Sequence, residues 1–147
     1  MTTIAYKNGI LAADTQLTDG NLKMICHKLF KVQANGCFAV AGNTDDEQLW
    51  KRWYLAGADY SDCPRLKAFA AIQLDQHGDV YWWHKTTKIP IEQPFMSIGS
   101  GEQIARAGLH MGLSAIDAVK LAGELDINTN TIIDYYSART QKIKEGN

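Results

Sequence analysis

The sequence predicts an α+β protein, and two observations carry this prediction. Strand-like segments come in pairs joined by short turns, while the two helix-like segments after residue 101 follow each other directly. Antiparallel hairpins with grouped helices are typical of α+β folds, whereas regular alternation of strands and helices would predict a parallel sheet. Several returning strands are apolar without alternation, so we expect two sheets packed together between helix layers, which buries these strands on both faces.

Two hairpins are predicted near the start of the chain. Their four strands cover residues 3–7, 10–13, 28–32 and 37–42. Asn8 and Gly9 form the first turn, because a tight primed turn needs positive φ at both central positions. Residues 34–36 form the second turn, and the polar stretch 15–23 is expected to be a loop.

The first helix is predicted to begin at Asn43 and to fade near residue 56. Cap-forming side chains come first, and acidic residues follow in the first turn, where the helix dipole favours them. Trp50, Trp53 and Tyr54 fall on one face of this helix. Two interpretations of these aromatics stay open, a core-facing stripe and a surface for an interface.

A third hairpin, two helices and a closing strand are expected after the first helix. The strands are predicted at residues 66–74, 80–84, 95–98 and 131–136, and the helices at 102–111 and 115–125. Ser114 has the side chain and the position of an N-cap for the last helix. The polar tail from Gln141 is expected to fray.

Composition limits the functional classes. The 147 residues suit one domain, 1–147, with 46% hydrophobic and 21% charged residues and a net charge of -1, which gives no reason to expect a nucleic acid or membrane partner. No apolar run approaches the roughly 20 residues that a membrane-spanning helix needs, and no signal peptide is recognised. The three cysteines and four histidines lack metal-ligand spacing, so we expect reduced thiols, a cytoplasmic location and no metal site.

Thr2 is a candidate nucleophile. Methionine before a small residue is readily removed, and loss of Met1 would leave Thr2 with a hydroxyl and a free α-amine. An α-amine has an unperturbed pKa of roughly 7.7–8.0, so near neutral pH it can accept the proton of the hydroxyl. A hydroxyl with such a base is one of the known activated nucleophiles.

The order of several short motifs resembles the proteasome β-type subunits, most closely the bacterial HslV type, within the N-terminal nucleophile hydrolases. The resemblance covers nearly the whole chain. Its motifs are Thr2-Thr3-Ile4, Ala12-Ala13-Asp14, Lys28-Leu29-Phe30, Ala39-Val40-Ala41-Gly42, Ile98-Gly99-Ser100-Gly101 and Asp126-Ile127-Asn128-Thr129-Asn130 leading to Asp134. The fold implied by the resemblance is a four-layer αββα sandwich.

The resemblance implies a catalytic centre around Thr2. Thr2 Oγ1 would attack a peptide carbonyl, and the freed α-amine would take its proton. Lys28 would place a cation beside Thr2 and lower the pKa of that amine. Asp14 would hold the Lys28 ammonium through a charge-assisted hydrogen bond.

Further roles follow from the same resemblance. Ser100 and Asp126 would complete the polar network around the amine, with Thr129 in support. The backbone N–H of Ala39 would stabilise the oxyanion, at a position where proteasome subunits usually have glycine.

One departure from the family concerns length. Proteasome subunits usually carry a second long helix after the first, and here the chain passes from residues 60–64 almost directly into the next strand. We therefore expect a sandwich shortened by one helix, in a family that forms homo-oligomeric rings, takes peptides or unfolded proteins as substrates, needs no cofactor and works with an ATPase unfoldase.

Three functional hypotheses remain at this point. The first is a threonine endopeptidase in a self-compartmentalising ring. The second is a non-catalytic ring or scaffold subunit that retains Met1. The third is an amidase of the same broad fold that acts on small molecules.

Overall fold

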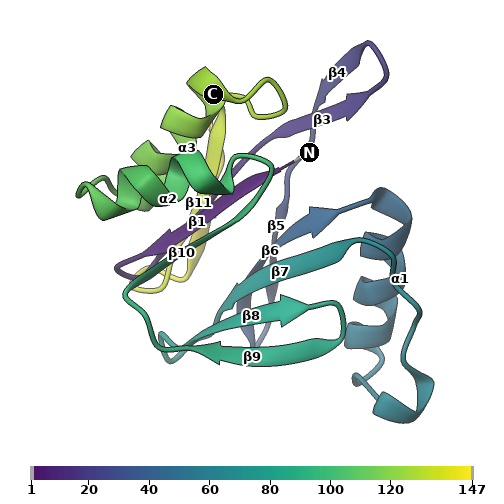
Figure 1. Ribbon diagram of the computed structural model, residues 1–147. Coiled ribbons are helices and arrows are strands. Elements are labelled where there is room, and N and C mark those ends of the chain that lie inside the picture. The colour runs from purple at the N-terminus through teal and green to yellow at the C-terminus, as the bar shows by residue number, and fades with distance from the viewer. Residues whose placement is uncertain (1, 147) are drawn as a thin grey trace.

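The computed structural model describes residues 2–146 and has four layers (Figure 1). Two five-stranded antiparallel sheets pack face to face. The helices α2 (Glu102–His110) and α3 (Ala115–Leu125) cover the outer face of one sheet. The helix α1 (Thr44–Leu55) covers the outer face of the other sheet. The expected α+β architecture, with two sheets between helices, is confirmed.

The strand order explains why the two ends of the chain meet in one sheet. The first sheet contains, in order, β10 (Phe95–Gly99), β1 (Thr3–Lys7), β2 (Ile10–Asp14), β11 (Ile133–Ser137) and β12 (Lys142–Lys144). The second contains β5 (Leu29–Val32), β6 (Gly36–Gly42), β7 (Phe69–Leu74), β8 (Val80–His84) and β9 (Thr87–Ile91). A separate hairpin, β3 (Gln16–Asp19) with β4 (Leu22–Ile25), extends from the first sheet in Figure 1.

The two strands with the least alternation are buried on both faces, as expected. Within β2, Leu11 faces the second sheet, whereas Ala12 packs under α2 and α3. Within β6, Ala39 faces the first sheet and Phe38 packs against α1. A sheet covered on both sides has no wet face, so neither strand can show a polar alternation.

The local signals at turns and caps are confirmed. Asn8 and Gly9 have φ values of 51° and 74°, as a primed turn requires. Asn43 and Ser114 are the N-caps of α1 and α3, each accepting a hydrogen bond from the backbone N–H three residues later.

Two expectations for polar segments are wrong. Residues 15–23 are mostly the β3–β4 hairpin and not a loop; its two-residue connection has Gly20 at φ 59°, a conformation that glycine adopts without strain. The tail beyond Gln141 is also ordered, because β12 pairs with β11. Strand β9, which follows β8 in a further hairpin, was not expected. In β9 and β12 the apolar side chains of Ile91 and Ile143 pack against the core, but the polar and charged residues around them hide the pairing in the sequence.

The open interpretation of the first-helix aromatics is decided by packing. Trp50 and Trp53 are buried between α1 and the second sheet. The Tyr54 ring stacks on that of Trp50 with centroids 4.9 Å apart. These residues therefore anchor α1, which in turn fixes the position of its N-terminus beside the cavities described below.

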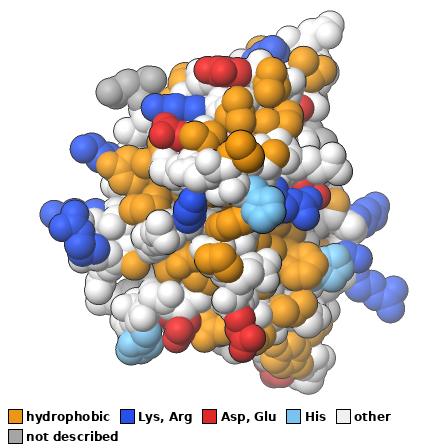
Figure 2. Space-filling view, turned by 60° about the vertical axis from the view of Figure 1, so that its left-hand side comes forward, with side chains coloured by type: hydrophobic (Ala, Val, Ile, Leu, Met, Phe, Trp, Pro, Cys, Tyr) orange, Lys and Arg blue, Asp and Glu red, His pale blue; other side chains and the backbone are white. Residues whose placement is uncertain are grey.

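Apolar side chains also remain at the surface. Exposed residues of this kind include Leu22, Ile25, Leu55, Tyr60, Met111, Leu125 and Ile127. On the face that Figure 2 shows, hydrophobic side chains occupy a large part of the surface between charged ones. Within residues 2–146, no helix is long and apolar enough to cross a membrane.

Candidate functional site

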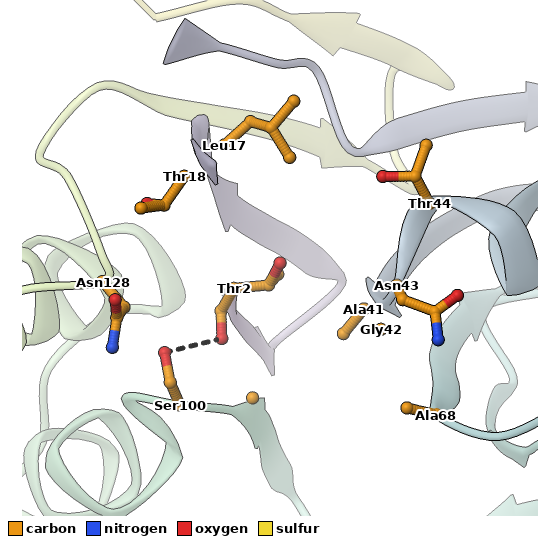
Figure 3. A pocket seen from close by; sticks show the side chains of 11 residues that line it. Thr2, Leu17, Thr18, Ala41, Gly42, Asn43, Thr44, Ala68, Ser100 and Asn128 are labelled. Atoms are coloured by element: carbon orange, nitrogen blue, oxygen red, sulfur yellow. Dashed lines mark hydrogen bonds between the residues drawn. The ribbon is translucent and has the colours of Figure 1, made fainter. Parts of the chain in front are cut away.

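Thr2 lies just before β1 and is buried, with 7% of its surface exposed. The backbone N–H of Ser100 donates to the Thr2 carbonyl over 2.7 Å, and Ser100 Oγ approaches the same oxygen at 3.5 Å (Figure 3). Gly99 has φ 102°, and a Cβ there would lie 1.7 Å from the Thr2 carbonyl oxygen. The end of β10 therefore holds the backbone of Thr2 closely. Met1, on whose removal a free amine at Thr2 depends, lies outside the described residues.

A buried ion pair lies beside Thr2. Lys28 Nζ donates to Asp14 Oδ1 over 2.8 Å, and the side chains are 6% and 0% exposed. The Asp14 carboxylate also accepts from the backbone N–H groups of Thr3, Gln16 and Asn130. Because all three donors are backbone groups, they hold the Asp14 carboxylate in one orientation. The carboxylate in turn fixes the ammonium, which is the contact expected from the sequence.

The environment of Lys28 makes its ammonium easier to deprotonate. Burial lowers the pKa of Lys28, and the attraction of Asp14 offsets this only in part. A lysine of this kind is a stronger influence on a neighbouring amine than a solvated one, because little water screens it.

A second polar network involves residues from three elements. Asp126 Oδ2 accepts from Ser100 Oγ over 2.8 Å and from Thr129 Oγ1 over 2.6 Å. Burial alone would raise the pKa of Asp126, but the hydrogen bonds from Thr129 and Ser100 outweigh it and lower the pKa. Thr129 Oγ1 also lies 2.7 Å from Thr3 Oγ1, which accepts from the Gly101 N–H. The structure thus brings Ser100, Asp126 and Thr129 together.

Two connected cavities meet at Thr2. The larger, which we call the cleft, has a volume of about 740 Å³ and is open to solvent. Figure 3 shows Thr2 between two walls of the cleft, with Ser100 and Asn128 on one side and residues around the start of α1 on the other. The smaller, which we call the recess, has about 60 Å³ and is lined by Thr2, Gln16, Leu17, Cys26, Lys28, Val40, Gly42, Thr44 and Glu47. Thr2 and Lys28 therefore share a cavity.

The structure does not bring Ala39 to this site. Ala39 is fully buried inside β6, paired with Leu29 on one side and Ile72 on the other. The N–H of Val40 donates to the Lys28 carbonyl, and N–H groups alternate sides along a strand, so that of Ala39 points toward β7. This donor belongs to the sheet ladder and is not available to a substrate.

Gly42, at the end of β6, is the better candidate for the oxyanion donor. By the same alternation its N–H points to the side of β5, but at this level β5 has not yet begun. Gly42 lines both the cleft and the recess, as Thr2 does. Its φ of 133° and a Cβ position 2.0 Å from the Ala68 carbonyl oxygen require glycine here. Sequence reasoning missed it, although a glycine directly before a helix cap was a usable signal.

Asp46 supports the cleft and was also missed. Its buried carboxylate accepts from the backbone N–H groups of Lys67 and Ala68 over 2.7 and 2.6 Å. Ala68 lines the cleft, so Asp46 attaches that wall to the first turn of α1. The sequence showed only an acidic residue in a first turn, a common feature that carries no sign of a distant partner.

His27, next to Lys28, forms a further polar contact. Its Nδ1 lies 2.6 Å from Asp134 Oδ2, and the other carboxylate oxygen of Asp134 accepts from the Gly146 N–H. The hydrogen bond with Asp134 raises the pKa of His27 above its ordinary value of 6.5. The hydrogen bond connects the segment just before β5, which carries Lys28, to β11 and to the tail that follows β12.

This contact predicts a pH-dependent stability. Because the folded pKa of His27 is raised, its stabilising effect is complete below about pH 6.5 and is lost as the pH rises through the folded pKa. The melting temperature of the wild type should therefore approach that of His27→Asn as the pH is raised from about 5.5 to about 8.5. His77→Asn, which changes an exposed turn residue, is the control and should show a pH-independent difference. A constant gap for His27→Asn would contradict the prediction.

No group of three or more histidine, cysteine or acidic side chains within residues 2–146 has the arrangement of a metal site.

The chain has the proteasome-like fold of HslV and BPH. BPH of Thiobacillus denitrificans, solved alone and in complex with epoxomicin, aligns with a TM-score of 0.66 and 14% identity over 99% of this chain and 98% of that chain. Eukaryotic HslV from Trypanosoma brucei aligns with a TM-score of 0.70 and 19% identity over 97% of this chain and 99% of that chain. No protein-family model and no curated protein matches the sequence.

Proposed function

We propose that this protein is a threonine endopeptidase that works in a self-compartmentalising ring, with Thr2 as the nucleophile after removal of Met1. The observation that carries the proposal is the position of Thr2, held by β10 at the junction of cleft and recess with Lys28 in the same recess. A buried ion pair beside a threonine that can become N-terminal has a direct use in this chemistry.

The proposed reaction has two halves. The free amine of Thr2 takes the proton of Oγ1 as this oxygen attacks the substrate carbonyl, and the amine then gives the proton to the leaving peptide nitrogen. The ester left on Thr2 is hydrolysed by a water that the amine deprotonates. Lys28 disfavours the ammonium form of the amine and keeps it in the neutral form that can accept a proton.

The remaining residues stabilise and orient. The Gly42 N–H donates to the oxyanion of each tetrahedral intermediate, in place of the Ala39 donor that the resemblance implied. Ser100, held by Asp126, orients the amine and any bridging water. Asp14 positions Lys28, and Thr129 positions Asp126. Among these, Asp14, Asp126 and Thr129 act through other side chains.

We also propose that the protein forms a homo-oligomeric ring. The exposed apolar side chains support an assembly, because large apolar areas on a protein surface are typical of interfaces. Within residues 2–146, α1 is followed only by the short 3-10 turn η1 (Tyr60–Asp62) before β7. We infer that the second long helix of proteasome subunits is lost here, which favours a single ring or a different pairing of faces. An ATPase unfoldase is the proposed partner.

A cytoplasmic location is part of the same proposal. Cys26, Cys37 and Cys63 are all free thiols. Burial raises the pKa of Cys37 to about 12, so this thiol is inert, but the exposed Cys63 would oxidise in a compartment that forms disulfides.

The test removes the hydroxyl group of Thr2 from the assembled protein. A cleavable leader placed directly before Thr2 exposes its amine, and an electrophilic peptide then labels the protein; epoxomicin, present in the BPH complex, is a suitable probe. We expect one covalent adduct per chain on Thr2 and hydrolysis of fluorogenic peptides, with both lost in Thr2→Ala.

Two further measurements separate the hypotheses. Protein from the native host should have the mass of a chain without Met1. A chain that retains Met1, and that shows no labelling after its removal, would support the non-catalytic ring subunit instead. Labelling by small amide electrophiles but not by peptides would support the amidase.

A further inference from the structure

Glu47 places a carboxyl group in the recess, and the proposed catalytic steps do not use it. Glu47 follows the N-terminus of α1 and is half-buried. Its side chain lines the recess together with Thr2 and Lys28, and it interacts electrostatically with Lys28. Any group that enters the recess from the cleft therefore meets an acid.

The recess is placed to receive a substrate side chain. It borders Thr2 and Gly42, where the attacked carbonyl and its oxyanion would lie, and it shares these residues with the cleft. The side chain on the acyl side of the scissile bond is the substrate group closest to this carbonyl. The recess has a volume of about 60 Å³ against about 740 Å³ for the cleft, so a small side chain fits it better than a large one.

The Glu47 carboxyl group can accept a hydrogen bond from a group that enters the recess. Lys28 is already held by Asp14. The Lys51 ammonium lies over the Phe30 ring, 4.6 Å from its centroid, and also attracts Glu47. Burial raises the pKa of Glu47, and Lys51 and Lys28 oppose this rise. In either protonation state the carboxyl group can accept a hydrogen bond from a hydroxyl.

We propose that Glu47 is a specificity-determining residue that selects a small hydroxyl side chain, serine or threonine, on the acyl side of the scissile bond. This inference rests on the proposed function. A threonine hydroxyl would donate to the Glu47 carboxylate, whereas valine, which has the same shape, would leave that carboxylate in a recess without a partner. An aspartate would bring a second negative charge beside it.

The experiment compares isosteric peptides with the Met1-free enzyme. Fluorogenic peptides that differ only at this position carry threonine or valine, serine or alanine, and asparagine or aspartate. We expect kcat/KM to be about tenfold higher for threonine than for valine, as one hydrogen bond to a charged group allows. We expect aspartate to be turned over at least tenfold more slowly than asparagine.

Two variants separate the acceptor from the charge. Glu47→Gln keeps an acceptor of the same size, so it should keep the threonine preference and lose the rejection of aspartate. Glu47→Leu should lose both preferences. Gln48→Leu, at the exposed neighbouring position, is the matched control and should keep the wild-type profile. If Glu47→Leu does not fold, Glu47→Gln alone still tests the charge effect.

Each outcome decides between the two proposals. Turnover that depends on Thr2 but treats threonine and valine alike overturns the role of Glu47 and leaves the proposed function intact. Turnover highest for lysine or phenylalanine peptides also overturns it, because the recess would then not limit the side chain. Absence of Thr2-dependent turnover and labelling overturns the proposed function itself.

Discussion

Replacement of Lys28 by methionine is expected to abolish peptide hydrolysis and to destabilise the fold. The ammonium is buried and bound to Asp14 Oδ1 at 2.8 Å, so its loss leaves a fully buried carboxylate without its cation. Breaking a buried ion pair on one side costs about 3–5 kcal/mol. The activity should fall by at least about 100-fold, because the amine of Thr2 loses the charge that keeps it in the neutral, proton-accepting form.

The design separates stability from catalysis. The double variant Asp14→Asn with Lys28→Met removes both charges and should recover much of the free energy of unfolding, as measured with urea, without recovering turnover. Lys31→Met removes an exposed lysine from β5, the strand that follows Lys28, and should retain both properties. Wild-type turnover by the double variant would show that the ion pair is only structural.

Gly42→Ala is expected to lower both the stability and the activity of the protein strongly. The φ of 133° is a strained conformation for alanine, and the added Cβ would lie 2.0 Å from the Ala68 carbonyl oxygen. A non-glycine residue in such a conformation costs about 1–3 kcal/mol before any clash is counted. The backbone must shift, so the N–H that we assign to the oxyanion moves away from Thr2, and kcat should fall about 100- to 1,000-fold.

Gly57→Ala is the matched control for this change. Gly57 has φ 112°, but no atom lies within 4 Å of the added Cβ. It carries the backbone strain without the clash and without a place at the cavities. We expect a loss of about 1–2 kcal/mol in the free energy of unfolding and unchanged kcat per folded protein. Equal kcat in Gly42→Ala and Gly57→Ala would contradict the assignment of the oxyanion donor.

The comparison of sequence and structure shows which signals are local. Asn8-Gly9 and the Ser114 cap act through their own and adjacent backbone groups, so their effect is visible in a few residues. The β3–β4 hairpin and β12 were missed because their strands are only three or four residues long, too short for a periodicity to be recognised. A strand at the edge of a sheet is ordered by its hydrogen bonds with a neighbouring strand, and its own sequence does not show which strand that is.

The candidate site divides in the same way. Each predicted side chain of the site belongs to a short ordered motif. Near Thr2 the structure joins Lys28 to Asp14, and it joins Ser100 and Thr129 to Asp126. Ala39 belongs to a motif as well, but the direction of its N–H depends on the strand register, which a motif does not contain. Glu47 belongs to no motif. Its place in the recess follows only from the packing of α1 against the second sheet, which Trp50 stabilises.

By itself, the sequence determined the hairpins, the caps, the two-sheet class and the chemical types present at the chain's beginning, because turn conformation, capping and burial periodicity are properties of neighbouring residues. Only the tertiary structure decided that Gly42 lines the same two cavities as Thr2, how small the recess beside Thr2 is and that an acid lines it. Those features arise where β6, α1 and the segment before β5 meet, and packing between distant segments sets their geometry.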